Sequence, residues 1–124
     1  MIELTFARAV TSSPKPMPRM PETEHPNVLP LEGEIDLHVS PAIASSLKAM
    51  TKEKPPRLVV DMSRVKYIDS SGLAVLIEAM QAVQGYGGKF LLCGIQDGVK
   101  PIFEIARLDQ VFRILPDVDA ALAA

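Results

Sequence analysis

The stretch KYIDSSGLAVLIEAM, residues 66–80, decides the fold of this chain. Tyr67 and Ile68, at its start, are residue types that strands favour. The polar run Asp-Ser-Ser-Gly then occupies residues 69–72. The pattern predicts a strand, a tight polar turn and a helix, in that order. Apolar residues after the turn follow the spacing of one helix face: Leu73, Leu76, Ile77, Met80 and Val83.

The polar residues at this junction exceed what a helix cap requires. One of Asp69, Ser70 and Ser71 would satisfy the free amides at the helix start, a role worth about 1 kcal/mol. The helix start also carries a positive partial charge, so a phosphate on Ser70 would sit there without disrupting the fold. We expect the missing side chain of Gly72 to leave the neighbouring hydroxyl accessible. These residues alone are compatible with a plain cap and with a hydroxyl placed for modification.

The rest of the chain is expected to alternate strands and helices. Residues 1–10 read as a half-buried strand, residues 11–26 as an exposed proline-rich loop, and residues 27–124 as the core. Pro30 predicts that the second strand, 27–36, lies at a sheet edge or contains a bulge. Further strands are expected at 57–62, 89–94 and 111–115, and helices at 41–51, from the polar junction to about 85, from about 97, and at 118–124.

These elements predict an α/β fold. Short connectors between alternating strands and helices imply parallel crossovers. We therefore predict a single domain over 1–124, with a mixed, mostly parallel central β-sheet of about five strands and about four helices. Ser40 is expected to cap the start of the helix at 41–51, and Asp117 the start of the last helix. The glycine-rich residues from Gly85 onward are expected to end the helix that follows the polar junction.

Composition excludes several classes of function. The 124 residues carry a net charge of −2 without a cluster of basic residues, so neither a nucleic acid partner nor membrane insertion is expected. Cys93 is the single cysteine and lies in an apolar, strand-like run, where an inert buried thiol is expected. One cysteine and two histidines cannot form a zinc site, and we expect no metal or cofactor. No apolar run reaches the roughly 18 residues of a membrane span, so a cytoplasmic protein is expected.

Catalytic motifs are weak. The sequence GYGGKF, residues 85–90, lies between a helix and a strand, the reverse of a phosphate-binding loop. A hydrolase reading would use Ser70 as nucleophile, with His38 as base oriented by Asp36, but the Gly-x-Ser-x-Gly pattern is missing. We expect no enzyme. Four acids near expected strand ends are read as turn and cap residues without metal-ligand spacing: Asp36, Asp61, Asp69 and Asp97.

The motifs together resemble the STAS family, which is named for sulphate transporters and anti-sigma-factor antagonists. The resemblance spans about 28–124. It rests on Gly-Glu-Ile-Asp at 33–36, Asp-Ser-Ser-Gly-Leu-Ala at 69–74 after a strand, and Gly-Gly-Lys at 87–89 at the next strand, in this order.

The resemblance implies a phosphorylation switch. In the family's bacterial antagonists, the serine after the motif aspartate is phosphorylated, and here that serine is Ser70. The kinase is the anti-sigma factor, an ATP-dependent serine kinase, which the unphosphorylated antagonist binds so that the sigma factor is released. A separate phosphatase, of the PP2C type, restores the antagonist. The residues expected at the partner-binding surface are Asp36, Asp69, Ser71 and Gly72.

Other settings stay open at this stage. The chain could be the soluble STAS subunit of a lipid or anion transport complex, or a ligand-sensing STAS domain outside any sigma pathway. The long proline-rich connection between the first two expected strands departs from the family pattern.

Overall fold

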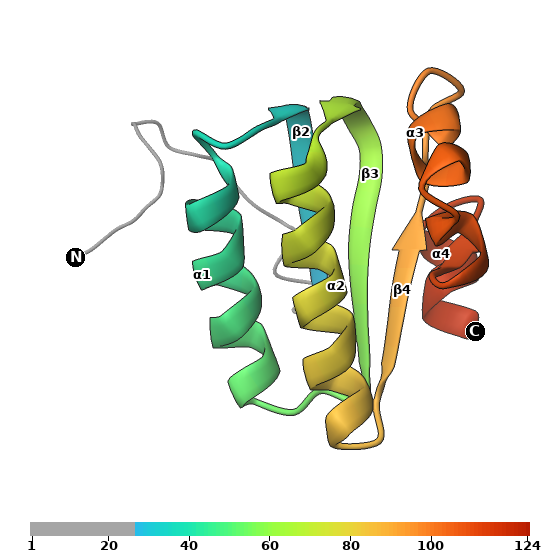
Figure 1. Cartoon of the computed structure of the whole chain (residues 1–124). Helices are drawn as coiled ribbons and strands as arrows, with labels where there is room; N and C mark the ends of the chain where they lie inside the picture. Colours follow the sequence, from blue (N-terminus) through green and yellow to red (C-terminus); the bar gives the residue numbers. More distant parts are fainter. Residues whose placement is uncertain (1–26) are drawn as a thin grey trace, which may run out of the picture.

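The fold is an open parallel sheet with helices on both faces, seen in a computed structural model that describes residues 27–124 (Figure 1). The strand expected at 1–10 and the proline-rich loop expected at 11–26 lie outside the described residues. The helices and strands are β2 (Val28–Ile35), α1 (Ser40–Lys52), β3 (Arg57–Ile68), α2 (Ser70–Gly85), β4 (Lys89–Cys93), α3 (Lys100–Ile105), a 3-10 turn (Leu108–Gln110), β5 (Arg113–Leu115) and α4 (Val118–Ala123).

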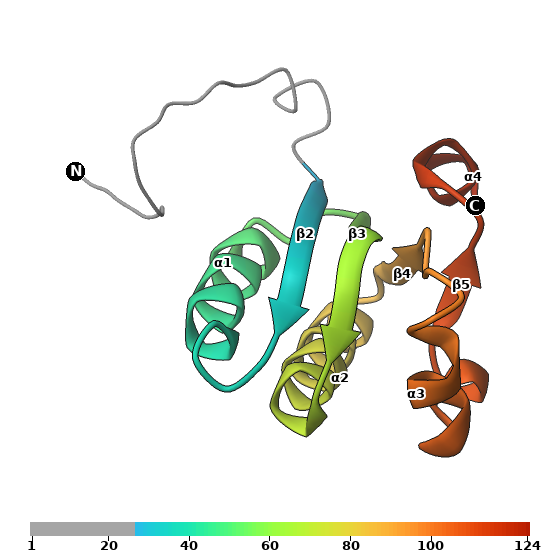
Figure 2. The same ribbon diagram turned by 90° about the horizontal axis from the view of Figure 1, so that it is seen from above.

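The sheet confirms the α/β prediction. Its described strands lie in the order β2-β3-β4-β5, and each neighbouring pair is parallel. Helices α1 and α2 cover one face, and α4 lies on the other (Figure 2). Because all these strands run the same way, their carboxyl ends meet at one edge of the sheet, where α1 and α2 begin.

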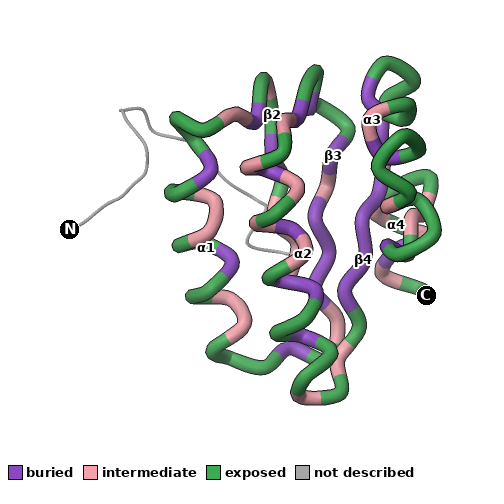
Figure 3. The backbone as a smooth tube through the Cα atoms, viewed as in Figure 1, coloured by how far each residue is buried: buried purple, intermediate pink, exposed green. Residues whose placement is uncertain are grey.

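Two apolar clusters hold these layers together, and buried residues line the central strands and the inward sides of the helices (Figure 3). The larger cluster lies between the sheet and α1, α2 and α3, and includes Leu47, Leu76 and Phe103. The smaller lies under α4 and joins Ala121 to Cys93 of β4 and to residues of β3. The expected buried thiol is confirmed, and burial raises the pKa of Cys93 to about 12.

Strand β3 is longer than the sequence pattern predicts. It runs from Arg57 to Ile68 because the pairing with β2 shifts register twice, between Pro30 and Glu32 and again between Gly33 and Glu34. At each shift, β3 contains one residue more than β2, which is the definition of a bulge. The expectation that Pro30 marks an edge or a bulge is confirmed, since β2 is also the outer strand among those described.

The starts and ends of the helices agree with the sequence-based predictions at two helices and differ at two. Asp117 accepts a hydrogen bond from the Ala120 amide at 2.8 Å and caps α4 as expected. Helix α2 ends at Gly85, also as expected. Helix α3 begins at Lys100, not near Asp97. Ser40 does not cap α1: the N-cap residue is Val39, with no side-chain cap hydrogen bond.

Candidate functional site

The candidate site lies at the carboxyl ends of β2 and β3, where the polar run 69–72 starts α2 (Figure 1). The loop of residues 36–39, between β2 and α1, lies at the same edge, and a backbone hydrogen bond of 3.0 Å from Asp69 N to Ile35 O joins the cap of α2 to the strand end from which this loop starts. The edge therefore brings together two segments that the sequence analysis singled out separately.

Asp69 is the cap of α2. Its Oδ1 accepts hydrogen bonds from the Ser71 amide at 2.9 Å, the Gly72 amide at 3.2 Å and the Ser71 hydroxyl at 2.6 Å. The Ser71 hydroxyl is the main cause that lowers the pKa of Asp69 below its ordinary value of 3.8, and the amides of Gly72, Ser71 and Leu37 lower it further. The carboxylate is therefore ionised at neutral pH, and its Oδ1 is committed to the first turn of its own helix.

The two serines of the run differ sharply. Ser70 is the first residue of α2 and is exposed. Ser71 is half-buried, and its hydroxyl contacts both the Asp69 carboxylate and the Ser40 hydroxyl, the latter at 2.8 Å. Of the two hydroxyls, the one on Ser70 is the more accessible to an enzyme that modifies the protein.

Gly72 serves a different purpose from the one expected. It is buried, and a Cβ atom on it would lie 2.7 Å from Cγ1 of Ile68 and 2.8 Å from Cγ2 of Ile35. The glycine therefore lets the first turn of α2 press against the ends of β2 and β3. The expectation that it opens access to a neighbouring hydroxyl is wrong, because its Cα faces the core.

Asp36 shapes the loop that follows β2. Its Oδ1 accepts the backbone amides of His38 at 2.9 Å and Val39 at 3.4 Å. The carboxylate thus holds its own loop, and the contact with His38 is through the backbone and not through the imidazole ring. The hydrolase hypothesis needs an aspartate that orients the His38 ring, and the hydrogen bonds of the Asp36 carboxylate go to backbone amides instead.

Exposed apolar side chains surround this edge, and the sequence analysis missed them. Leu37 is 70% exposed, Val39 38% and Tyr67 48%. Leu37 and Val39 belong to the 36–39 loop, and Tyr67 lies near the end of β3, opposite Glu34. The sequence hints at the exposure of Leu37 and Val39 only in that these apolar residues flank His38 in an expected turn. Large apolar side chains left exposed together are typical of a surface that binds another protein.

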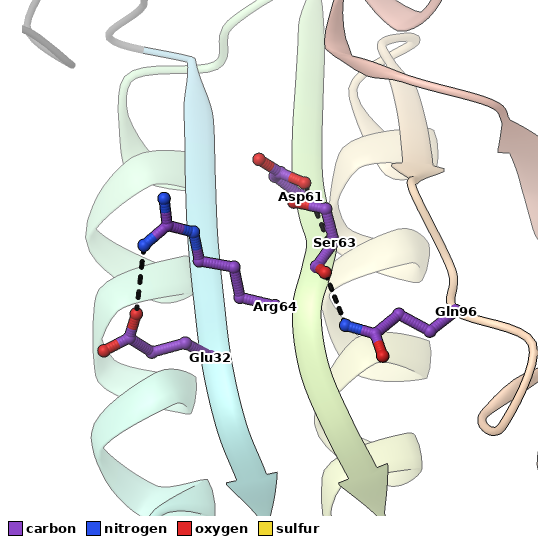
Figure 4. Close-up of polar contacts among 5 residues, drawn as sticks. All are labelled: Glu32, Asp61, Ser63, Arg64 and Gln96. Carbon is purple, nitrogen blue, oxygen red and sulfur yellow. Dashed lines mark hydrogen bonds and ion pairs between the residues drawn. The ribbon is translucent and has the colours of Figure 1, made fainter.

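A second polar group lies on β3 away from this edge. Figure 4 shows Gln96 reaching Ser63, whose carbonyl oxygen accepts from Gln96 Nε2 at 2.6 Å, while the Ser63 amide donates to Asp61 Oδ1 at 3.0 Å. Arg64 and Glu32 pair loosely at 4.0 Å, and both are largely exposed. Asp61 was expected near a strand end but lies inside β3. The bond from Gln96 to Ser63 ties the bulged part of β3 to the loop after β4.

Metal and membrane features are limited within residues 27–124. This part of the chain has no group of three histidine, cysteine, aspartate or glutamate side chains that could hold a metal ion. None of its helices is both long enough and apolar enough to cross a bilayer.

Comparison with known proteins identifies the family. The sequence model of the STAS domain matches residues 17–121, which is most of the chain. The protein therefore belongs to the STAS domain family.

Individual relatives agree with this assignment. The chain is 28% identical over 93 residues to the anti-sigma-B factor antagonist of Listeria monocytogenes, covering 75% of this chain and 81% of that protein. Its fold superposes on the crystal structure of an anti-sigma factor antagonist from Mycobacterium paratuberculosis with a TM-score of 0.71 and 29% identity, covering 77% and 81% of the two chains.

A transporter relative shares the fold as well. The crystal structure of a sulfate transporter family protein from Wolinella succinogenes has a TM-score of 0.69 at 23% identity, covering 78% of this chain and 81% of that one. At this identity the likeness concerns the fold alone.

Proposed function

We propose that the protein is an anti-sigma-factor antagonist, which binds an anti-sigma factor with serine kinase activity and is released when Ser70 is phosphorylated. The STAS family assignment and the names of the relatives support this role. The observation that carries it is the contrast at the start of α2, where Ser70 is exposed while the Ser71 hydroxyl is bonded to Asp69.

The chemistry needs only an accessible hydroxyl on this chain. Ser70 Oγ would attack the γ-phosphorus of ATP, the bond from that phosphorus to the ADP oxygen would break, and the hydroxyl proton would pass to a base of the kinase. A PP2C-type phosphatase would then hydrolyse the ester and return inorganic phosphate. Because the kinase uses ATP, we place the switch in the cytoplasm.

The phosphate would act on binding and not on the fold. It would add a charge of about −1.5 to −2 at the first residue of α2, beside the ionised Asp69 and close to the apolar loop. A partner that packs on the apolar side chains of Leu37 and Val39 would have to remove water from the phosphate, and this cost would weaken its binding. In this proposal the surface consists of these two residues with Tyr67, while Asp36, Asp69, Ser71 and Gly72 hold its shape.

Phosphorylation tests the acceptor. Incubation with the cognate kinase and ATP should add the mass of one phosphate to the intact protein, and fragmentation should place it on Ser70. Ser70→Ala should abolish the gain, and Ser71→Ala should keep it. A gain that survives Ser70→Ala and is lost in Ser71→Ala would show that the acceptor is the wrong residue.

Binding tests the surface with a matched control. Leu37→Ala should weaken the binding of the unphosphorylated protein to its kinase partner about tenfold, which is about 1.4 kcal/mol, because the proposal makes Leu37 one of the few side chains that dominate the binding energy. Ile105→Ala removes an apolar side chain that is 84% exposed on α3, far along the chain from the site, and should leave affinity unchanged.

Co-purification with a membrane transport complex and not with a kinase would favour the alternative role, a soluble STAS subunit of a transport complex.

A further inference from the structure

A row of three oxygen contacts crosses the candidate site. The Asp36 carbonyl oxygen lies 2.7 Å from Ser40 Oγ, Ser40 Oγ lies 2.8 Å from Ser71 Oγ, and Ser71 Oγ lies 2.6 Å from Asp69 Oδ1. The carbonyl and the ionised carboxylate at the two ends accept hydrogen bonds and donate none. The two hydroxyls supply one proton each, so three contacts share two protons.

The charges decide where the protons lie. A hydrogen bond to an anion is stronger than one to a neutral oxygen, so Ser71 donates to Asp69. The Asp36 carbonyl already accepts the amides of Ser40 at 2.9 Å and Val39 at 3.2 Å. The one proton of Ser40 has two acceptors within reach, the Asp36 carbonyl at 2.7 Å and Ser71 Oγ at 2.8 Å, and shared between them it bridges both contacts.

The link is buried at its Ser40 end. Ser40 is 4% exposed, and among residues 27–124 it is the buried residue with a polar side chain. If Ser71 were removed, the Ser40 hydroxyl would keep the Asp36 carbonyl and lose its contact with α2, in a place that water does not reach. The link also joins residues 31 positions apart, one at the start of α1 and one at the start of α2. Between Ser40 and β2 lies the 36–39 loop, which carries exposed Leu37 and Val39.

We propose that Ser40 is a positioning residue: through its contact with Ser71, its hydroxyl fastens the 36–39 loop to the start of α2 and so holds Leu37 in place at the same end of the sheet as Ser70. The functional part rests on the proposed role of Ser70 as phosphate acceptor. Ser71 gives its proton to Asp69 and a lone pair to Ser40, and these two contacts together direct a kinase to Ser70 and away from its neighbour.

The first arm of the test measures the link itself. Urea unfolding of the wild type, Ser40→Ala, Ser71→Ala and the double variant forms a double-mutant cycle. We expect each single change to lower the unfolding midpoint and the double variant to fall no further than the more damaging single change. Ser45→Ala, on the exposed side of α1, should be additive with Ser71→Ala. Additive effects of Ser40→Ala and Ser71→Ala would overturn the link.

The second arm measures positioning. In steady-state phosphorylation by the cognate kinase, Ser40→Ala should raise the KM for the protein about tenfold, a change of about 1.4 kcal/mol in binding. The kcat and the KM for ATP should stay within about twofold, because no reacting atom has changed. Ser45→Ala should match the wild type.

The two arms separate the two ideas. If the kinase leaves the wild type unmodified, the proposed function fails while the cycle still reports on the link. Coupling in the cycle together with an unchanged KM in Ser40→Ala would overturn the positioning role and leave Ser40 as a structural residue only.

Discussion

Two helices of this protein start in the same way and differ in what surrounds the start. Helices α2 and α4 each follow a parallel strand and are each capped by an aspartate with extended backbone, Asp69 and Asp117. Asp69 accepts two amides and a hydroxyl, whereas Asp117 accepts the single amide of Ala120. The starts of both helices therefore have an aspartate cap, and a capping aspartate by itself says nothing about function.

The positions after each cap carry the difference. The first residue is the exposed Ser70 in α2 and the half-buried Val118 in α4. The second is the bonded Ser71 in α2 and the exposed acid Asp119 in α4. A modifiable hydroxyl, and not the cap, distinguishes the start of α2.

The third position gives the largest expected effect. Gly72 holds it in α2, pressed against Ile35 and Ile68, while Ala120 holds it in α4. Gly72→Ala should lower the free energy of unfolding by about 1–3 kcal/mol, as expected for an added methyl group in a packed core. Urea unfolding measures this change.

The other end of α2 supplies the control. A Cβ atom on Gly85 would meet nothing within 4 Å, and the residue ends the same helix. Gly85→Ala should leave stability unchanged or raise it by up to about 1 kcal/mol through helix propensity. Equal midpoints for the two variants would show that the start of α2 is not packed as described.

Short-range patterns predicted the elements well. The change from the strand pattern to helical spacing after Ile68 placed α2, the glycines after Gln84 ended it, and Pro30 marked the irregular outer strand. Each of these depends on backbone preferences of residues a few positions apart.

Long-range contacts were beyond that kind of pattern. The sequence analysis placed a strand at 57–62, whereas β3 runs on to Ile68. In this added part, Val65 and Ile68 are buried three positions apart, a spacing that a regular strand with its repeat of two does not produce. The bulges that explain this spacing depend on pairing with β2. The role of Gly72 depends on Ile35 of another strand, and that of Ser40 on a serine 31 positions away.

The cap of α4 gives the second prediction, and Cys93 is its probe. Cys93 is buried in the cluster under α4, which is a short helix of 6 residues. Asp117→Ala should raise the rate of Cys93 labelling by a thiol reagent in native buffer about fivefold, because losing a cap costs about 1 kcal/mol and favours local opening of the helix.

A change at the same position controls for charge, because burial first and then the carboxylates of Asp61 and Asp117 raise the pKa of Cys93. Asp117→Asn removes this charge and keeps a side chain that can cap the helix, and it should label close to the wild type. A similar increase in both variants would mean that charge near Cys93, and not opening of α4, sets the rate.

The smallest expected effect is the pH dependence that the cap of α2 gives to stability. The pKa of Asp69 is lowered in the folded protein, mainly by the Ser71 hydroxyl, so the unfolded chain binds this proton more readily. Its contribution to stability is fully present above the ordinary value of 3.8 and is lost as the pH falls through the lower, folded value. The urea midpoint should therefore fall between pH 6 and pH 3 by more in the wild type than in Asp69→Asn. Ser71→Ala should reduce this fall, because it removes the main cause of the lowered pKa, whereas Ser70→Ala should keep it. An equal fall in all four proteins would mean that the bond from Ser71 to Asp69, on which the distinction between the two serines depends, does not form in solution.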